Sequence, residues 1–353
     1  MNKHALLRAG LNMLHYSGLA RMAAPLFAGV GAIFMLHHVR PMPSRQQGFA
    51  PNAGLDVSPQ FLDAVIGYVR TRGFRLLSLE QAVEELKSGK AGQRAPFAVF
   101  TLDDGYRDNL RHALPVFEKH ACPFTLFMAT AYVDGKGELW WDILERAIDS
   151  NDEIRPMLEE LPARMATVTD EDKQNAWNLL YPYVRWKLEE HEQRRWIRRF
   201  AEAHGIDVDG LCRAEILGWD ELKALAANPL CTIGAHTVHH YALARLGDTV
   251  EVISEMRESR ERLEAELGIP VRTMAYPYGD ERSAGVREFL LAEDAGFACA
   301  VTTRKGLIHA EHDARLMALP RFSLNGFYQD LRYVDVMLTG VPFALAERLR
   351  LAG

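Results

Sequence analysis

Short apolar runs alternate with segments of helical periodicity along most of this chain, and this alternation constrains the fold more than any other feature. The runs are nearly continuous in apolar residues, as is typical of strands covered on both faces. They fall at residues 31–39, 75–78, 97–102, 123–129, 231–236, 272–277, 297–303 and 319–324. Helical spacing of apolar residues occurs between them at 61–73, 79–90, 107–121, 250–268 and 283–296. The alternation predicts an α/β fold with a parallel sheet, either open or closed into a barrel.

One region, residues 138–217, breaks the alternation. It contains no convincing strand and is rich in charge, leucine and tryptophan, so we expect a helical insertion on the face where a barrel carries its chemistry. The helical spacing of its tryptophans favours packing in a core, and contact with sugar rings is the alternative. These residues are Trp140, Trp141, Trp177, Trp186 and Trp196. The remaining chain divides into a barrel over 30–137 and 218–330, an N-terminal segment over 1–29 and a helical tail over 331–353.

The N-terminal segment is apolar but does not have the pattern of an export signal. Charged and polar residues such as Arg8 and Arg21 interrupt its apolar runs. The longest run, residues 22–36, has about 15 residues and includes Pro25, which is too short for a clear membrane span. We expect one or two amphipathic helices over residues 3–28 that pack on the domain, with peripheral binding to a membrane surface as the alternative. The expected location is the cytoplasm, or the inner face of the membrane.

Charge and cysteine content exclude other classes of protein. The formal net charge of −6 gives no sign of the basic surface that nucleic-acid binding requires. The four cysteines are widely scattered and none forms a C-x-x-C pair, so neither a zinc knuckle nor a redox motif is indicated. Free buried thiols in a reducing compartment are the simplest interpretation.

Two adjacent carboxylates, Asp103 and Asp104, end the apolar run at 97–102 and are followed by Gly105. Aspartate and glycine are common turn residues, and an aspartate could also cap a following helix, so the pair by itself is ambiguous. The pair becomes informative because a second polar group, rich in histidine, follows another predicted strand.

Three histidines, His236, His239 and His240, follow the run at 231–236. The i, i+4 spacing of His236 and His240 is expected to place both on one side of a helical turn, with His239 as a bystander. Two imidazoles and one carboxylate make a typical catalytic zinc set with a position open for water. One aspartate of the pair could complete this set, and the other would be free to act on the water.

A third element, TMAYPYGDE at 273–281, includes the end of the predicted strand at 272–277 and the turn after it. It is interpreted either as a simple turn, since proline and glycine are common there, or as a pocket wall that aims a backbone N–H inward.

The motifs TLDDG (101–105), HTVHH (236–240) and AYPYG (275–279) occur in the same order as the first three motifs of the NodB-homology polysaccharide deacetylases, the family-four carbohydrate esterases. The chain resembles this family over roughly residues 30–325, with Leu102 where phenylalanine is usual. The resemblance implies a distorted (β/α)7 barrel, a divalent metal ion, usually Zn2+, and removal of N- or O-acetyl groups from sugars.

The resemblance also implies roles for single residues. Asp103 matches the catalytic base, and Asp104, His236 and His240 match the metal ligands. Many members carry an arginine that orients the base at the position of Ala275. Because this chain lacks that arginine, Arg321 in the stretch LPRF is the candidate replacement.

The general acid of the family is a histidine, and three positions are open. We favour His37 in LHH (36–38), with His38 and with His309 in LIH (307–309) as alternatives. The backbone N–H of Tyr278 is the candidate donor to the oxyanion, and Pro277 and Tyr276 are expected beside it in the pocket wall.

The expected substrate is a carbohydrate, because the resemblance implies one. An oligosaccharide or a lipid-linked glycan precursor fits better than an exported polymer, since the chain has no clear signal peptide. Two alternatives stay open: a metal-dependent hydrolase of a small non-sugar amide, or a non-catalytic glycan-binding barrel. The second is disfavoured because a binding protein does not need a base beside a metal.

Overall fold

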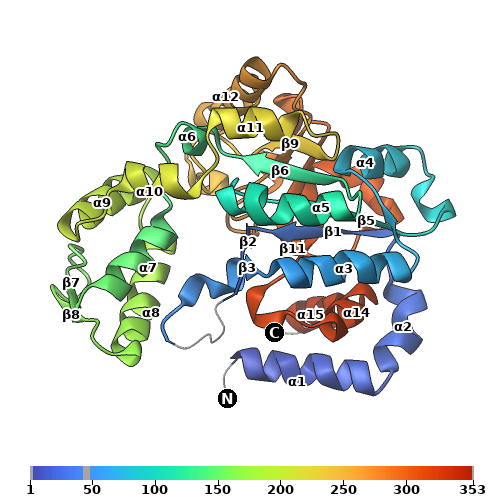
Figure 1. The fold of residues 1–353 in the computed structure, drawn as a ribbon, viewed down its shortest axis with the longest axis horizontal. Helices are drawn as coiled ribbons and strands as arrows, with labels where there is room; N and C mark the ends of the chain where they lie inside the picture. The colour runs from blue at the N-terminus through green and yellow to red at the C-terminus, as the bar shows by residue number, and fades with distance from the viewer. Residues whose placement is uncertain (1–2, 43–47, 352–353) are drawn as a thin grey trace.

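A closed barrel of parallel strands lies at the centre of the computed structural model, which describes residues 3–42 and 48–351 (Figure 1). The strand order is β1-β12-β11-β10-β9-β6-β5, and a second pairing, of β5 with β1, closes the ring. The barrel strands are β1 (Gly31–Leu36), β5 (Phe97–Leu102), β6 (Phe124–Met128), β9 (Cys231–Ala235), β10 (Thr273–Ala275), β11 (Cys299–Lys305) and β12 (Leu319–Ser323). The predicted (β/α)7 barrel is confirmed.

Two short pairings extend the barrel at opposite ends. β4 (Arg75–Leu76) pairs with the first residues of β5. β2 (His38–Val39) pairs with β3 (Asp56–Val57) just beyond the end of β1. The predicted strand at 31–39 is therefore split at His37, where the chain leaves the barrel ladder and takes a new partner.

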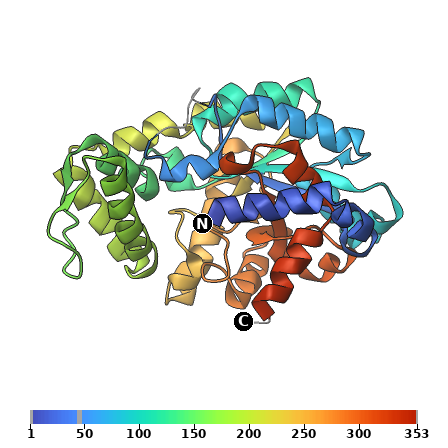
Figure 2. The same cartoon turned by 90° about the horizontal axis from the view of Figure 1, so that it is seen from below.

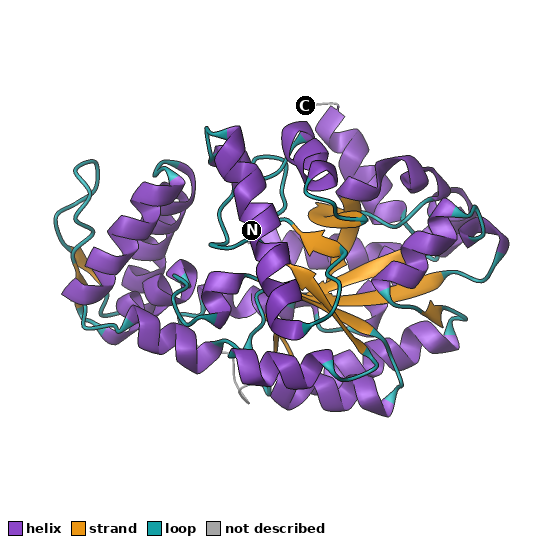
Figure 3. Cartoon of the chain, turned by 90° about the horizontal axis from the view of Figure 1, so that it is seen from above, coloured by secondary structure: helices purple, strands orange, loops and turns teal. Residues whose placement is uncertain are grey.

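Helices surround the barrel, as Figure 3 shows. The main ones are α3 (Pro59–Thr71), α4 (Leu79–Lys87), α5 (Leu114–Lys119), α11 (Trp219–Ala226), α12 (Thr249–Leu267) and α13 (Val286–Asp294), and a short helix, α6 (Thr130–Val133), follows β6. Ser78 caps α4 through a reciprocal capping box with Gln81. The predicted helix at 107–121 begins at residue 107 but contains a π-helical turn over Asn109–Ala113, because Pro115 has no N–H to bond the carbonyl four residues back.

The helical insertion, residues 138–217, lies at one side of the barrel, at the left of Figure 1. Its helices are α7 (Trp140–Ser150), α8 (Asp170–Trp186), α9 (Glu190–Ala203) and α10 (Val208–Glu215). The expectation of no strand was wrong in one detail, since β7 (Glu153–Ile154) and β8 (Met165–Ala166) form an antiparallel pair. Strands of two residues have no periodic pattern that a sequence could reveal. Four of its five tryptophans are buried, and Trp186 is half-buried.

Two helices at each end of the chain pack together beside the barrel (Figure 2). They are α1 (Lys3–Tyr16) and α2 (Leu19–Phe27) at the start and α14 (Leu331–Leu338) and α15 (Val341–Leu351) at the end. Residues 1, 2, 352 and 353 of the predicted terminal segments lie outside the described residues. Within 3–42 and 48–351, no helix is long and apolar enough to cross a membrane.

Candidate active site

The carboxyl ends of β1, β5 and β9 place the predicted residues on one rim of the barrel. Leu36 is in register with Leu102, so the next residues, His37 and Asp103, follow side by side. The Asp103 N–H donates to the Leu36 carbonyl at 3.0 Å, and the His236 N–H donates to the Met128 carbonyl at 2.9 Å. The barrel ladder thus runs up to Asp103 and His236.

A sharp turn directs the two adjacent carboxylates apart. Asp104 has φ +69° and Gly105 has φ +71°, and the left-handed region is uncommon for any residue other than glycine. A Cβ on Gly105 would lie 2.2 Å from the Met128 side chain, so both the backbone angle and the space require glycine there.

Asp104, His236 and His240 converge on one point. The Asp104 Oδ1 atom lies 3.5 Å from His236 Nε2 and 3.2 Å from His240 Nε2. One ligand atom from each residue lies within 4.8 Å of the others, and all three residues are at most 3% exposed. Asp104 Oδ1 has no partner with hydrogen-bond geometry among the described residues. A buried carboxylate oxygen left in this state beside two imidazole nitrogens fits a bound cation, and the N, N, O donor set suits Zn2+.

The charge states of these groups suit a metal site. Burial lowers the pKa of His240 to about 4, so its imidazole is neutral at pH 7, the form that binds a cation. Burial opposes ionisation of Asp104, but the His240 and His236 imidazoles hold the pKa of that carboxyl well below its usual value. Asp104 and His240 therefore offer one negative and one neutral ligand.

The two imidazoles are oriented in different ways. His236 Nδ1 lies 2.6 Å from the Ala275 carbonyl, which leaves Nε2 facing Asp104. His240 Nδ1 has no hydrogen-bond partner among the described residues. The His240 ring lies among the rings of Tyr132, Trp141 and Tyr278, with centroids 5.5, 5.3 and 4.8 Å away.

The expectation that His236 and His240 share one side of a helical turn was wrong. Residues 236–240 form an irregular loop after β9, in which Thr237 and His240 have φ +65° and +57°. Thr237 Oγ1 accepts a hydrogen bond from the His240 N–H at 3.0 Å. This bend, and not helical periodicity, brings both rings to Asp104.

Arg321 forms a two-pronged ion pair with Asp103. Its Nη1 and Nη2 atoms donate to the two carboxylate oxygens at 2.7 and 2.6 Å, and its Nε donates to the Thr302 carbonyl at 2.8 Å. The structure thus brings Arg321 to the carboxylate that sequence reasoning assigned to it. Burial would raise the pKa of Asp103, but Arg321 holds it below its usual range, so the carboxylate is ionised at pH 7.

The three candidate acid histidines lie in different places. His37 is half-buried beside the metal set; burial lowers its pKa, and the charges of Asp104 and Asp103 oppose this. His38 is bound to Asp108, with 2.6 Å between Nδ1 and Oδ2, and its ring lies on Tyr106. His309 follows Ile308, which bridges to Gly31 at the start of β1. That is the opposite end of the barrel, so the alternative at His309 was wrong.

The residues of the third motif separate into two groups. Tyr278 has φ +60°, its hydroxyl accepts from Trp140 Nε1 at 2.8 Å, and its N–H makes no hydrogen bond within the described residues. Pro277 precedes it in a tight turn, in which its carbonyl accepts from the Gly279 N–H. Tyr276 packs against Phe289, and its hydroxyl donates to the Met317 carbonyl at 2.9 Å. The placement of Tyr276 in the pocket wall was therefore wrong, because its side chain belongs to the packing between barrel and α13.

Sequence reasoning did not name Tyr106, and it did not connect Trp141 with the metal set. Trp141 of α7 donates from Nε1 to the Tyr106 hydroxyl at 3.0 Å, and both are buried. Tyr106 follows Gly105 directly, and Trp141 opens the insertion, so their positions next to the motif and the insertion boundary were the available signal.

A family model described as polysaccharide deacetylase matches residues 90–160 and 183–299, which is more than half of the chain. The unmatched stretch 161–182 is shorter than the predicted insertion, so the match includes α7, α9 and α10. No curated protein matches the chain.

Several solved structures share the fold. The Streptococcus pyogenes deacetylase PplD, solved in complex with acetate, is 17% identical over 87% of this chain and 97% of its own, with a TM-score of 0.55. A de-N-acetylase from Aggregatibacter actinomycetemcomitans is 12% identical over 87% and 99%, with a TM-score of 0.54. IcaB from Ammonifex degensii is 16% identical over 89% and 97%, with a TM-score of 0.53. The match to the family model, together with this fold, shows that the chain belongs to the polysaccharide deacetylase family, the NodB-homology hydrolases.

Proposed function

We propose that this protein is a metal-dependent deacetylase that hydrolyses N-acetyl or O-acetyl groups on a carbohydrate. The observation that carries the proposal is the position of Asp103, ionised by Arg321, directly beside the set of Asp104, His236 and His240. Binding a sugar would not require a base next to a metal set, whereas hydrolysis does.

The proposed cation is Zn2+, held by Asp104 Oδ1 and by one ring nitrogen each of His236 and His240. When bound, it would polarise the acetyl carbonyl and lower the pKa of a water molecule. The chain supplies what the ion cannot, which is proton transfer and a hydrogen bond to the developing oxyanion.

Each proton movement has a group in the chain to perform it. Asp103 accepts the proton of the attacking water, and Arg321 keeps this carboxylate ionised and in place. The Tyr278 N–H, which makes no other hydrogen bond within the described residues, is the proposed donor to the oxyanion. His37 is the proposed donor to the leaving group. An amide depends on this acid more than an ester, because an amine anion is a very poor leaving group.

We propose an oligosaccharide or lipid-linked glycan precursor as the substrate and the inner face of the membrane as the location. The support is an apolar outer stripe on α1 and α2, where Leu6, Met13, Leu19, Met22 and Leu26 are 58% to 81% exposed. Residues 1–50 contain no aspartate or glutamate, so no carboxylate of this segment would be repelled by anionic lipids. The acetate bound in PplD matches the product expected of this chemistry.

The test of the catalytic proposal is acetate release from a panel of acetylated amino sugars, chito-oligosaccharides and lipid-linked glycans, before and after removal of metal. We expect acetate release that a chelator abolishes and Zn2+ restores, with no change in the melting temperature large enough to indicate unfolding. Release from small non-sugar amides alone would favour the non-sugar hydrolase instead. Sugar binding without acetate release would favour a binding protein.

The membrane proposal has its own test. Sedimentation with anionic lipid vesicles should retain the wild type and lose a variant with Leu6→Ser, Met22→Ser and Leu26→Ser. A control with Val250→Ser, Val286→Ser and Leu290→Ser changes equally exposed apolar residues elsewhere and should bind like the wild type. Equal binding of both variants would refute docking through α1 and α2.

A further inference from the structure

The loop that carries both imidazoles is held by two different sets of contacts, one along its first half and one along its second half. In its first half, the carbonyls of Thr237 and Val238 accept from the backbone N–H groups of Thr130 and Ala131, at the start of α6 just after β6. Backbone pairing of the loop with this segment stops at this point. The carbonyls of the next two residues, His239 and His240, face the helical insertion instead.

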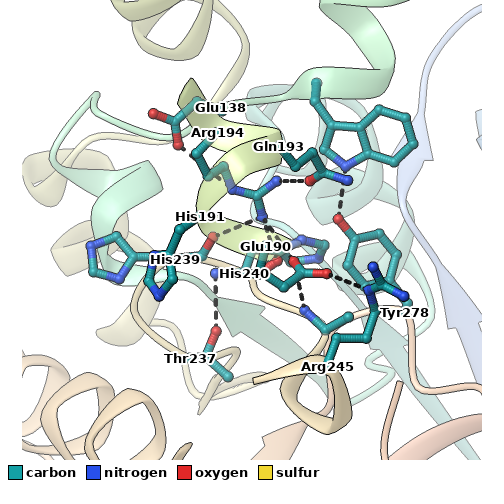
Figure 4. Close-up of polar contacts among 12 residues, drawn as sticks. Glu138, Glu190, His191, Gln193, Arg194, Thr237, His239, His240, Arg245 and Tyr278 are labelled. Atoms are coloured by element: carbon teal, nitrogen blue, oxygen red, sulfur yellow. Dashed lines mark hydrogen bonds and ion pairs between the residues drawn. The ribbon is translucent and has the colours of Figure 1, made fainter. Parts of the chain in front are cut away.

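Where the backbone pairing ends, Arg194 of α9 binds the next two carbonyls of the loop (Figure 4). Its Nη2 atom donates to the His240 carbonyl at 2.9 Å and to the His239 carbonyl at 3.3 Å. The Arg194 side chain is buried, and its Nη1 donates to Gln193. Glu138 and Glu190 lie 3.8 and 3.9 Å away and balance its charge.

Glu190, one turn earlier on α9, fixes the far end of the same loop. Its fully buried carboxylate accepts from the Ala242 N–H at 3.1 Å and pairs with Arg245 Nε at 3.2 Å. Arg245 in turn donates to the carbonyls of Trp186 and Leu188, between α8 and α9. The loop from 239 to 245 is therefore tied to the insertion through buried charged groups.

The two imidazoles thus depend on different parts of the molecule. His236 is fixed by the barrel, through the Met128 and Ala275 carbonyls. His240 is in the left-handed region, its Nδ1 has no hydrogen-bond partner among the described residues, and its carbonyl bonds to Arg194. A strained backbone persists only where the surroundings hold it, and for His240 the holding group on this side is the guanidinium of α9.

We propose that Arg194, supported by Glu190, is a positioning residue that aims the His240 imidazole at the cation site. The inference rests on the proposed function, since it needs a cation held by Asp104, His236 and His240. Losing such an outer support commonly weakens metal binding 10- to 100-fold without removing a ligand.

A neighbouring arginine on the same helix offers a matched control. Arg198 donates to Glu138 at 2.6 Å and to Asp209 at 3.0 Å, which are both within the insertion. Within the described residues, it makes no hydrogen bond or ion pair with the loop at 236–242. Arg198→Met therefore breaks ion pairs of the insertion as Arg194→Met does, but leaves the imidazole loop supported.

The experiment measures affinity for Zn2+ and Co2+ by chelator competition on the full chain, together with the visible absorption spectrum of bound Co2+. Arg194→Met should bind roughly 10- to 100-fold more weakly than wild type, with a changed Co2+ spectrum. Arg194→Lys should recover part of the affinity, and Arg198→Met should match wild type in both readouts. If Arg194→Met does not fold, Glu190→Gln replaces it and should show the same direction of change.

The outcomes separate the two proposals. If the wild type binds the ions, and Arg194→Met and Glu190→Gln bind them with the same affinity and the same Co2+ spectrum, the positioning role is overturned and the proposed function stays intact. An equal loss in Arg198→Met would also overturn it, because the effect would then belong to the insertion as a whole. A wild type that binds neither ion would overturn the proposed function, and the positioning role with it.

Discussion

The two halves of the candidate site are built in different ways. The carboxylate half stands at the end of β5, where Asp103 is bonded to the strand beside it and to Arg321 of β12. The imidazole half is an irregular loop held by side chains of helices, Arg194 of α9 and Glu255 of α12, which accepts from the N–H groups of Val238 and His239. The barrel thus fixes the proposed proton-transfer group, while the surrounding layer fixes a proposed metal ligand. Substitutions in the two halves should therefore change different measured quantities.

The largest effect is expected from Asp103→Asn. Without the base, kcat should fall roughly 10³- to 10⁴-fold, toward the upper end of what general base catalysis contributes. The affinity for Zn2+ should stay close to that of the wild type, because Asp103 is not among the proposed ligands. Acetate release and chelator competition on the same preparation measure both quantities. Retained activity, or loss of metal together with activity, would break the division between the halves.

The next effect tests the support of the carboxylate. Arg321→Met leaves Asp103 buried without its partner, and breaking one side of a buried pair typically costs about 3–5 kcal/mol of folding stability. The pKa of Asp103 should rise, so the acidic limb of the activity profile should move to higher pH. Denaturant unfolding and a pH profile measure the two changes.

A double variant provides the control for this prediction. Asp103→Leu with Arg321→Met replaces both charges by apolar groups and should recover much of the stability but none of the activity. A single Arg321→Met variant as stable as the wild type would mean that the ion pair does not hold this half together.

Sequence reasoning reached the carboxylate half more completely than the imidazole half, and the reason is physical. Strand periodicity located the end of β5, so Asp103 and Asp104 could be expected on the rim, and the family resemblance pointed to Arg321, which lies within β12. The loop after β9 depends on positive φ angles at Thr237 and His240, which neither periodicity nor composition encodes. Long-range contacts such as Arg194 with the His240 carbonyl join residues that no local pattern connects. The π-helical turn at Asn109–Ala113 and the two-residue strands of the insertion were missed because neither has a periodic pattern of its own.

A smaller, pH-dependent effect should mark His38 as structural and set it apart from His37. Burial lowers the pKa of His38, but the hydrogen bond to Asp108 and the charge of that carboxylate together outweigh burial and raise the pKa above the ordinary value. The stability from this pair is therefore fully present below about pH 6.5 and is lost as the pH rises through the folded-state pKa.

Asp108→Asn tests this directly. It should lower the unfolding free energy by roughly 1.5–3 kcal/mol at pH 6, the usual range for a hydrogen bond to a charged group, and by less at pH 9. Acetate release should persist, because His37 remains. A difference in unfolding free energy that grows with pH would contradict the structural role of the His38–Asp108 pair. A loss of activity as large as in a His37→Gln variant would mean that His38, and not His37, is the acid.

The smallest effect concerns the hydroxyl that shapes the imidazole loop. Thr237→Ala removes the acceptor for the His240 N–H, a contact worth about 1 kcal/mol, and should weaken Zn2+ binding roughly fivefold while leaving the pH profile of Asp103 unchanged. Thr237→Ser keeps the hydroxyl and should bind Zn2+ like the wild type. If serine and alanine weaken binding equally, the methyl group and its packing support the loop instead of the hydrogen bond. If neither changes the affinity, the guanidinium of Arg194 and the carboxylate of Glu255 suffice to hold the loop, since they bond its backbone at Val238, His239 and His240.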